Sequence, residues 1–232
     1  MPEPSAPGVA GGAPVVLAFD TAGSACSVAV GCGDAVLAYE RRDMRHGHAE
    51  ALLPMIGRTM RAAGLHPTDI CIVAATVGPG GFTGIRAGLA AAHGLALAAK
   101  ARLAGISGFG AVAALIDAGL PLVVALDSRR ADFYVQRFDE FGDACGEPAA
   151  VLPERLAGWA GADPLAVAGD AAEAAAAMLG RAATGVVPNS APDAKGVLAA
   201  LRRWPQKLDP EARPLYLRPP DVSFPKPGRG RL

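Results

Sequence analysis

The chain has 232 residues, and its 22 Lys and Arg residues balance 22 Asp and Glu residues to a net charge of zero. That length suits one large domain or two small ones of about 100 residues each. A neutral chain has no overall positive field to hold RNA, so we expect any nucleic-acid contact to be local or to come through a partner.

Composition also argues against several other classes of protein. Residues 1–14 have neither a basic start nor a continuous apolar stretch, so they do not resemble a signal peptide. No segment has the roughly 18 uninterrupted apolar residues of a membrane span, and we expect a cytoplasmic protein without membrane contact. The cysteines form no C-x-x-C pair, and their spacing suits neither a zinc site nor a disulfide framework; they are Cys26, Cys32, Cys71 and Cys145.

The chain repeats itself in outline between two extensions, residues 1–14 and 219–232, that we expect to be disordered. An apolar run at 15–20 ends in Asp, and a small-residue turn and two strand-like runs follow it. The same order recurs about a hundred residues later, where the run 122–127 also ends in Asp. Two β-β-β-α-β-α units predict two similar subdomains facing each other across a cleft, at 15–105 and 106–218. Chance could also produce this likeness, because apolar runs ending in Asp are common.

The first predicted helix runs from about residue 48 to 64 and contains Pro54, which should kink it or mark where its regular part begins. Helical spacing places one apolar face against the sheet, formed by Ala49, Leu52, Leu53, Ile56, Met60 and Ala63. A second, narrower stripe is left over, formed by Ala51, Met55, Thr59 and Ala62.

The second predicted helix, at about 82–100, has only four polar residues in nineteen. Gly84, Gly88 and Ala92 lie four residues apart and would let another backbone approach closely. A helix that is apolar nearly all round must be covered nearly all round, which one small sheet cannot do. We therefore expect another subunit to cover part of it, and an ordinary interior helix is the alternative.

Three turns have features of a nucleotide site. Asp20 and Thr21 follow the first strand, and Asp127 follows its counterpart in the second half. Such turns offer a carboxylate, hydroxyls and backbone N–H groups to a phosphate with its magnesium ion, although Asp also commonly forms turns. Gly169 lies in a strand-to-helix turn of the kind that holds adenosine in actin-like proteins. The loop 77–86 is glycine-rich but matches no standard nucleotide fingerprint.

No metal site or catalytic group is indicated. His46 and His48 are two residues apart and cannot share one helix face. No serine lies in a G-x-S-x-G context, and spacing reveals no nucleophile with its base.

Several motifs, in order, closely resemble those of the TsaB (YeaZ) family. They are F-D-T-A-G-S-A-C-S-V-A-V at 19–30, H-G-H-A-E-A-L-L-P-M-I at 46–56, G-P-G-G-F-T-G-I-R-A-G-L from residue 78, A-L-D-S-R-R-A-D-F-Y-V at 125–135, and P-L-Y-L-R at 214–218. The likeness covers about residues 15–218. Gly81 stands where the family usually has Ser, and His93 where it usually has Lys, which puts in doubt any detailed salt bridge to the partner.

The resemblance implies a degenerate actin-like ATPase fold of the ribonuclease H-like class, and a place in making threonylcarbamoyladenosine at position 37 of tRNAs that read ANN codons. Its implied partner is the paralogous enzyme TsaD. The histidine pair that holds a metal in TsaD falls on Gly108 and Val112 here, so no metal is expected. No cofactor is required, and at most weak ATP or ADP binding is expected from the vestigial site Asp20, Thr21, Asp127 and Gly169.

The family also implies a four-helix bundle between the two helices of the first half and the same helices of TsaD, or of a second copy in its absence. The resemblance places the partner interface on Ala51, Met55, Thr59, Ala62, Ile85, Gly88, Leu89, Ala92 and Leu95. The ATPase TsaE should join at the TsaB–TsaD junction, and tRNA should be contacted through the complex.

Three functions follow as hypotheses. The first is a non-catalytic scaffold that activates TsaD. The second is an ATP-dependent kinase or phosphatase of the actin-like class, with magnesium–ATP held by Asp20, Thr21 and Asp127. The third is a peptidase, for which no catalytic constellation is found.

Overall fold

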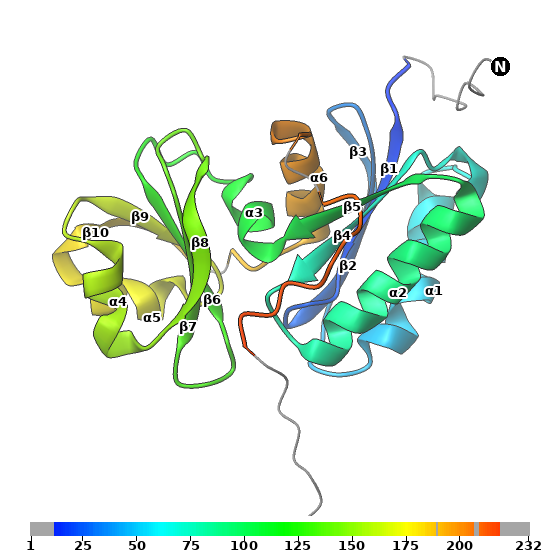
Figure 1. The fold of residues 1–232 in the computed structure, drawn as a ribbon. Helices are drawn as coiled ribbons and strands as arrows, with labels where there is room; N and C mark the ends of the chain where they lie inside the picture. The colour runs from blue at the N-terminus through cyan, green and yellow to red at the C-terminus, as the bar shows by residue number, and fades with distance from the viewer. Residues whose placement is uncertain (1–11, 189, 207–208, 219–232) are drawn as a thin grey trace, which may run out of the picture.

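The computed structural model describes residues 12–188, 190–206 and 209–218. The predicted tail and nearly all of the predicted N-terminal extension lie outside these residues. Within them the chain forms two five-stranded sheets with helices on both faces of each (Figure 1).

The first half contains five strands and three helices. Their order along the chain is β1 (Val15–Asp20), β2 (Ala25–Cys32), β3 (Ala35–Asp43), α1 (His48–Ala62), β4 (Ile72–Gly78), α2 (Phe82–Ala99), β5 (Arg102–Ser107) and α3 (Gly108–Ala113), with a short 3-10 turn η1 (Pro67–Asp69). The sheet order is β3-β2-β1-β4-β5. β1 is antiparallel to β2 and parallel to β4, so the carboxyl ends of β1, β4 and β5 lie at the same edge.

The second half repeats this arrangement. Its elements are β6 (Leu122–Asp127), β7 (Phe133–Phe138), β8 (Ala144–Val151), α4 (Pro153–Ala160), β9 (Leu165–Ala168), α5 (Ala172–Leu179), η2 (Gly180–Ala182), β10 (Ala183–Val187) and α6 (Ala194–Arg203). The sheet order, β8-β7-β6-β9-β10, matches the first sheet strand for strand. The predicted α/β fold with two similar halves is confirmed, and each unit is longer than predicted by one strand and one helix.

The last helix of each unit lies between the two sheets (Figure 1). α6 packs on the inner face of the first sheet through Val197, Leu198 and Leu201. α3 packs on the second sheet through Phe109 and Val112. The boundary drawn at residue 106 falls within β5, and it does not separate two independent cores, because α6 comes from the second half and completes the core of the first.

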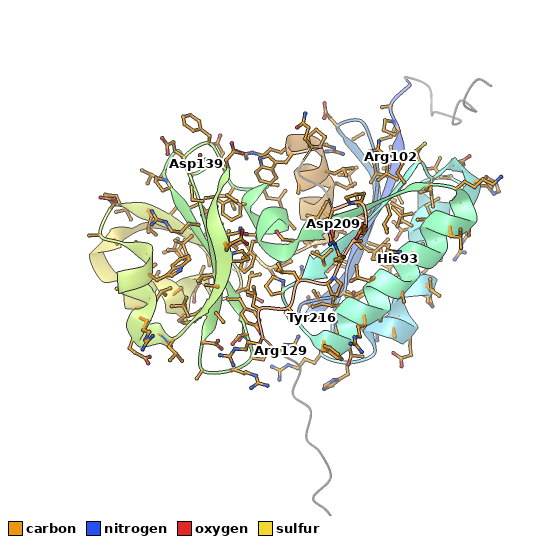
Figure 2. All side chains as sticks on the ribbon, viewed as in Figure 1. His93, Arg102, Arg129, Asp139, Asp209 and Tyr216 are labelled. Carbon is orange, nitrogen blue, oxygen red and sulfur yellow. The ribbon has the colours of Figure 1, made fainter. Side chains whose placement is uncertain are left out.

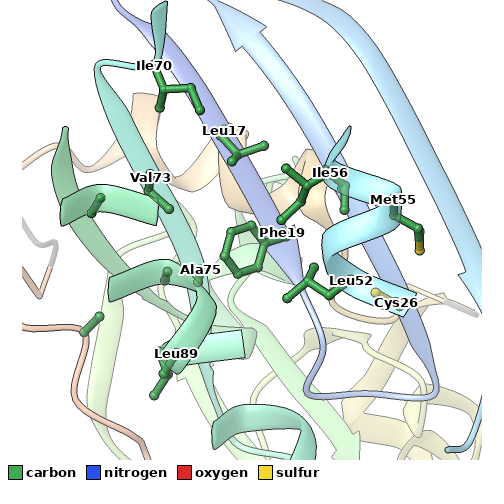
Figure 3. Close-up of a cluster of buried hydrophobic side chains, with 14 of the residues drawn as sticks. Leu17, Phe19, Cys26, Leu52, Met55, Ile56, Ile70, Val73, Ala75 and Leu89 are labelled. Atoms are coloured by element: carbon green, nitrogen blue, oxygen red, sulfur yellow. The ribbon is translucent and has the colours of Figure 1, made fainter. Parts of the chain in front are cut away.

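The buried face of α1 agrees with the prediction at Leu52, Ile56 and Met60, which lie in the core, but it differs at three other positions. Met55 and Thr59 were assigned to an outward stripe, but they are 0% and 2% exposed, and Met55 lies in the hydrophobic core (Figure 3). Leu53, assigned to the sheet face, is 56% exposed. Thr59 can be buried because its hydroxyl donates to the Met55 carbonyl at 2.9 Å and is left with no unsatisfied donor. Pro54 lies within the first turns of the continuous helix.

α2 begins against the turn that follows β1. The Thr21 hydroxyl donates to the Gly84 carbonyl at 2.8 Å, and the Gly81 amide donates to the Ala22 carbonyl at 2.8 Å. A Cβ on Gly84 would overlap the Thr21 carbonyl, and one on Gly88 would overlap the Thr21 hydroxyl. These two glycines therefore accommodate the chain's own turn, not a partner's backbone.

By length and mean hydropathy α2 could cross a membrane, and it is the one helix among the described residues that meets both criteria. Core helices of soluble proteins pass the same test. Here one side of α2 packs on the first sheet through Ile85, Leu89 and Ala92, and 28% of the helix is buried. Much of its apolar surface therefore faces outward.

The segment 209–218 joins the two halves. Residue Asp209 forms a bridge with Gly105 on the edge of the first sheet, and the Leu215 amide donates to the Val77 carbonyl at 2.7 Å. Arg218 then reaches the buried Asp132 in the β6–β7 turn, to which it is ion-paired. The C-terminal segment thus fixes the first sheet to the second.

Substitution of two glycines of α2, Gly88 and Gly94, should have opposite effects on stability. We expect Gly88→Ala to lower the free energy of unfolding by about 1–3 kcal/mol, because the new methyl group overlaps Thr21. We expect Gly94→Ala to raise it by about 0.5–1 kcal/mol, because a Cβ there has open space and alanine favours a helix. Urea unfolding of both variants measures the difference, and equal effects would contradict the packing described for α2.

Candidate functional site

The turns after β1 and β6 face each other at the carboxyl ends of the two sheets. Arg129, in the β6–β7 turn, lies between the two halves (Figure 2), and its guanidinium donates to the Gly23 carbonyl at 2.9 Å. The turn is tight enough that Arg129 adopts a left-handed φ of 58°, which is uncommon for a residue other than glycine. This contact closes one end of the space between the halves.

Asp20 is fully buried at the end of β1. Its Oδ1 accepts hydrogen bonds from the Thr76 hydroxyl and from the Ala22 amide, the latter at 3.2 Å. Its Oδ2 has no hydrogen-bond partner. Burial raises the pKa of this carboxyl to about 6, and the Thr76 hydroxyl opposes the shift. Asp20 is therefore placed inside the first half and not on the surface between the halves.

Thr21 is also buried in the first half, because it is 2% exposed and its hydroxyl donates a hydrogen bond to the Gly84 carbonyl. The second-half members lie apart from this pair. The Asp127 carboxylate accepts from the Arg129 amide at 2.7 Å, and the Asp127 amide donates to the Asp170 carboxylate at 2.8 Å. The sequence analysis assigned no role to Asp170, although this residue directly follows Gly169, which was predicted to belong to a nucleotide site.

Gly169 is required by the fold. It has a φ of 116°, and a Cβ there would overlap the Ala125 carbonyl. Its amide donates to the Ser190 hydroxyl at 2.7 Å. The structure thus brings Asp127 and Gly169 together in one place and puts Asp20 and Thr21 in another.

The space between these two places is small. A cavity of about 100 Å³ is lined by Gly23, Gly80, Asp127, Arg129 and Asp170, among others. Nucleotide-sized ligands need about 300 Å³ or more. Asp127 and Asp170 are close, and the pKa of Asp170 is raised chiefly by burial and further by the nearby Asp127 carboxylate. Two carboxylates disfavour a phosphate there unless a cation accompanies it.

No group of three or more potential metal ligands occurs among the residues that the structure describes. His46, His66 and His93 are exposed, whereas His48 is 8% exposed. Burial lowers the pKa of His48, which favours the neutral imidazole.

The predicted partner interface is mostly interior. Six of its nine residues are buried, namely Met55, Thr59, Ile85, Gly88, Leu89 and Ala92. Ala51 and Leu95 are half-buried, and Ala62 is exposed. The prediction of a surface is wrong for the six buried residues, because both helices turn this side toward the first sheet and toward each other.

A different face of the same helices is open. On α2 the exposed stripe contains Arg86, Ala90, His93, Gly94, Leu97 and Ala98. Leu97 is 83% exposed and Leu53 of α1 is 56% exposed; His93 marks this outer side of α2 (Figure 2). The predicted excess of apolar surface is therefore present, rotated away from the residues first assigned to it.

Residues 42–191 match the family model described as TsaD: tRNA N6-adenosine threonylcarbamoyltransferase. Escherichia coli (strain K12) has a tRNA threonylcarbamoyladenosine biosynthesis protein TsaB that is 35% identical over 60% of this chain, and the match spans 63% of that protein's length. An uncharacterized protein of Mycobacterium tuberculosis (strain H37Rv) is 36% identical over 90% of this chain and 93% of its own. YeaZ from Pseudomonas aeruginosa superposes with a TM-score of 0.76, at 25% identity, over 88% of this chain and 100% of its own.

This chain belongs to the TsaB (YeaZ) family. The family-model match also places it among relatives of the TsaD enzymes, which agrees with the two matching halves of its fold. The turns after β1 and β6 are thus expected in a protein with the TsaB fold. Their presence does not require that either of them bind a ligand.

Buried Asp20 predicts a pH dependence of stability. Its folded pKa of about 6 exceeds the unfolded value of 3.8, so the folded chain binds more protons in this window. The contribution of Asp20 to the free energy of unfolding should therefore fall by roughly 2–3 kcal/mol as pH rises from about 4 to above 6. Asp20→Asn should lack this fall, which urea unfolding at several pH values measures.

Because other groups titrate in both proteins, the test is the difference between the wild-type and Asp20→Asn curves. His48 acts with the opposite sign, since its lowered pKa costs stability as pH decreases. Parallel curves would contradict the prediction, because they would show that folding leaves the pKa of Asp20 near its unfolded value of 3.8.

Proposed function

We propose that this chain is a non-catalytic subunit of tRNA threonylcarbamoyladenosine biosynthesis that binds and activates a TsaD-type enzyme through the outer face of α1 and α2. The observation that carries the proposal is the exposed apolar stripe of α2 in a chain of the TsaB family. An apolar face left open on a soluble fold is a typical interaction surface.

Gly94 supports a close contact there. A glycine inside a helix costs about 1 kcal/mol relative to alanine, so it needs a reason in packing. Gly84 and Gly88 have one in Thr21, but a Cβ on Gly94 would meet nothing within 4 Å. A backbone of a second molecule that approaches at Gly94 would supply the missing reason, as in the small-residue contacts between packed helices.

A groove beside this stripe could receive partner side chains. It has a volume of about 420 Å³ and is lined by both helices and the loop after α1, through Ile56, Met60, Leu65, Ile70 and Leu95, among others. A bundle with two helices of a paralogue would cover the stripe and the groove together.

The same proposal leaves the chemistry to the partner. Asp20 and Thr21 are buried and hydrogen-bonded inside the first half, which argues against an ATP-dependent kinase that would use them. The proposal has three further parts. TsaE joins at the junction with TsaD, and tRNAs reading ANN codons are contacted through the complex. In the absence of TsaD the chain forms a homodimer.

The outer face can be tested with one substitution and a matched control. We expect Leu97→Asp to weaken association with TsaD at least about tenfold, because a carboxylate would be desolvated within the interface. Met178→Asp changes a similarly apolar residue on α5, 47% exposed and in the other half, and should leave association unchanged. Calorimetry with purified TsaD measures both, and thermal unfolding should show both variants folded.

Function is tested by reconstitution. TsaD, TsaE, the threonylcarbamoyl-AMP synthase and tRNA should form the modified nucleoside rapidly only when this chain is added, and the chain alone should form none. A rate that does not change on addition of the chain would refute the activating role.

A further inference from the structure

The C-terminal segment 209–218 brings an aromatic side chain to the start of α2. Tyr216 lies beside Phe82, the first residue of that helix, with ring centroids 5.4 Å apart and ring planes inclined by 33° (Figure 2). Both side chains stay open to solvent, since Tyr216 is 36% and Phe82 37% exposed. Aromatic residues are enriched in interaction surfaces, which makes this pair a candidate for one.

Arg86 is held by these two rings. Its guanidinium carbon lies 3.8 Å from the centroid of the Phe82 ring, and its Nε donates to the Tyr216 hydroxyl at 3.3 Å. The side chain is exposed, and it forms no salt bridge with any residue that the structure describes. The two terminal nitrogens of a positioned guanidinium are therefore available to an acceptor outside the chain.

The position of Arg86 favours binding of a carboxylate. A mobile arginine loses side-chain entropy when it is fixed in an interface, whereas the Arg86 guanidinium is already stacked on one ring and hydrogen-bonded to the other. The planar guanidinium also matches the two oxygens of a carboxylate, with which it can form paired hydrogen bonds. Phe82, Arg86 and Tyr216 thus form a site for one carboxylate at the surface.

This site is continuous with the exposed apolar stripe of α2. Arg86 is the first residue of that stripe, and Ala90, Gly94 and Leu97 follow it at helical spacing on the same exposed side. A helix packed along the stripe would therefore also cover Arg86. A covered guanidinium without a counter-ion is costly, so a partner that fits the stripe must supply the counter-ion itself.

The charges around the site also select an acidic partner. Between Phe82 and Ala99 the helix has no Asp or Glu, and its two titratable side chains are Arg86 and His93. A cavity of about 180 Å³ is lined by Phe82, Tyr216 and the cationic Arg130, among others. Glu50 of α1 lines another cavity with Phe82 but is not paired with Arg86. An acidic surface would complement this end of α2, and a basic one would be repelled.

We infer that Arg86, framed by Phe82 and Tyr216, is the charged anchor of the outer face and takes a carboxylate from an acidic side chain of the protein that covers α2. The inference rests on the proposed function and names the chemistry of the partner at one end of that face. It also makes the C-terminal segment part of the docking surface, because Tyr216 belongs to that segment. Protein is favoured over RNA because Arg86 stands at the end of an apolar stripe, which a phosphate backbone would leave uncovered.

The test uses the purified full chain and purified TsaD in calorimetry at low and high salt. We expect Arg86→Gln to weaken association about tenfold, because a charged pair of hydrogen bonds is lost. Arg86→Glu should weaken it about tenfold further, because two carboxylates would face each other. Added salt should lower the affinity of the wild type more than that of Arg86→Gln. Arg155→Gln, which changes an exposed arginine on α4 in the other half, should leave association unchanged.

Tyr216→Phe tests the contribution of the C-terminal segment. It removes the acceptor of the Arg86 Nε hydrogen bond and keeps the ring beside Phe82. We expect association to weaken about threefold, and Arg86→Gln to have a smaller effect in this background than in the wild type. Independent effects of the two substitutions would show that Tyr216 does not position Arg86 and would overturn this part of the inference. Both side chains are exposed, and unchanged thermal midpoints should confirm that the variants fold.

The results distinguish failure of this inference from failure of the proposed function. If Leu97→Asp weakens association with TsaD but neither Arg86 variant does, the outer face binds TsaD and the carboxylate anchor is wrong. If Arg86→Gln weakens binding of tRNA to the chain and leaves association with TsaD unchanged, Arg86 serves RNA and the inference is overturned. If the wild-type chain does not bind TsaD, the proposed function fails and the inference fails with it.

Discussion

The close fit of the turn after β1 against the start of α2 determines much of this structure. Thr21 is hydrogen-bonded to Gly84 and touches the position where Gly88 would carry a side chain, and the Ala22 carbonyl accepts from Gly81. The glycine-rich loop therefore places backbone against backbone. This contact brings α2 down onto the first sheet, so the position of the outer stripe depends on it.

Sequence reasoning found the two similar halves because each has the same order of apolar runs, Asp-containing turns and helices. It was only partly right on the orientation of α1, because it assigned Met55 and Thr59 to a second stripe facing a partner, although both are buried within the first half. It also missed that α6 packs on the first sheet, since the pattern of Val197, Leu198 and Leu201 shows which face is apolar but not which sheet it covers.

For the candidate site, residue types were easier to predict than their surroundings. Asp20 and Asp127 were recognised as paired strand-end residues. Only the three-dimensional arrangement shows that Asp20 is buried and hydrogen-bonded to Thr76, whereas Asp127 is exposed. The excess of apolar surface on α2 was foreseen from composition. Its position depends on which side Thr21 occupies, and that contact joins segments more than sixty residues apart in sequence.

The exchange of α3 and α6 between the sheets has a consequence for synthesis on the ribosome. The inner face of the first sheet is complete as a set of strands once β5 has emerged, but the helix that covers it comes near the end of the chain. Until then Val16, Ala18 and Ala74 have no covering layer from α6. Nascent chains thus carry an open apolar sheet from the synthesis of β5 until that of α6, and this is the stage at which a chaperone would protect them.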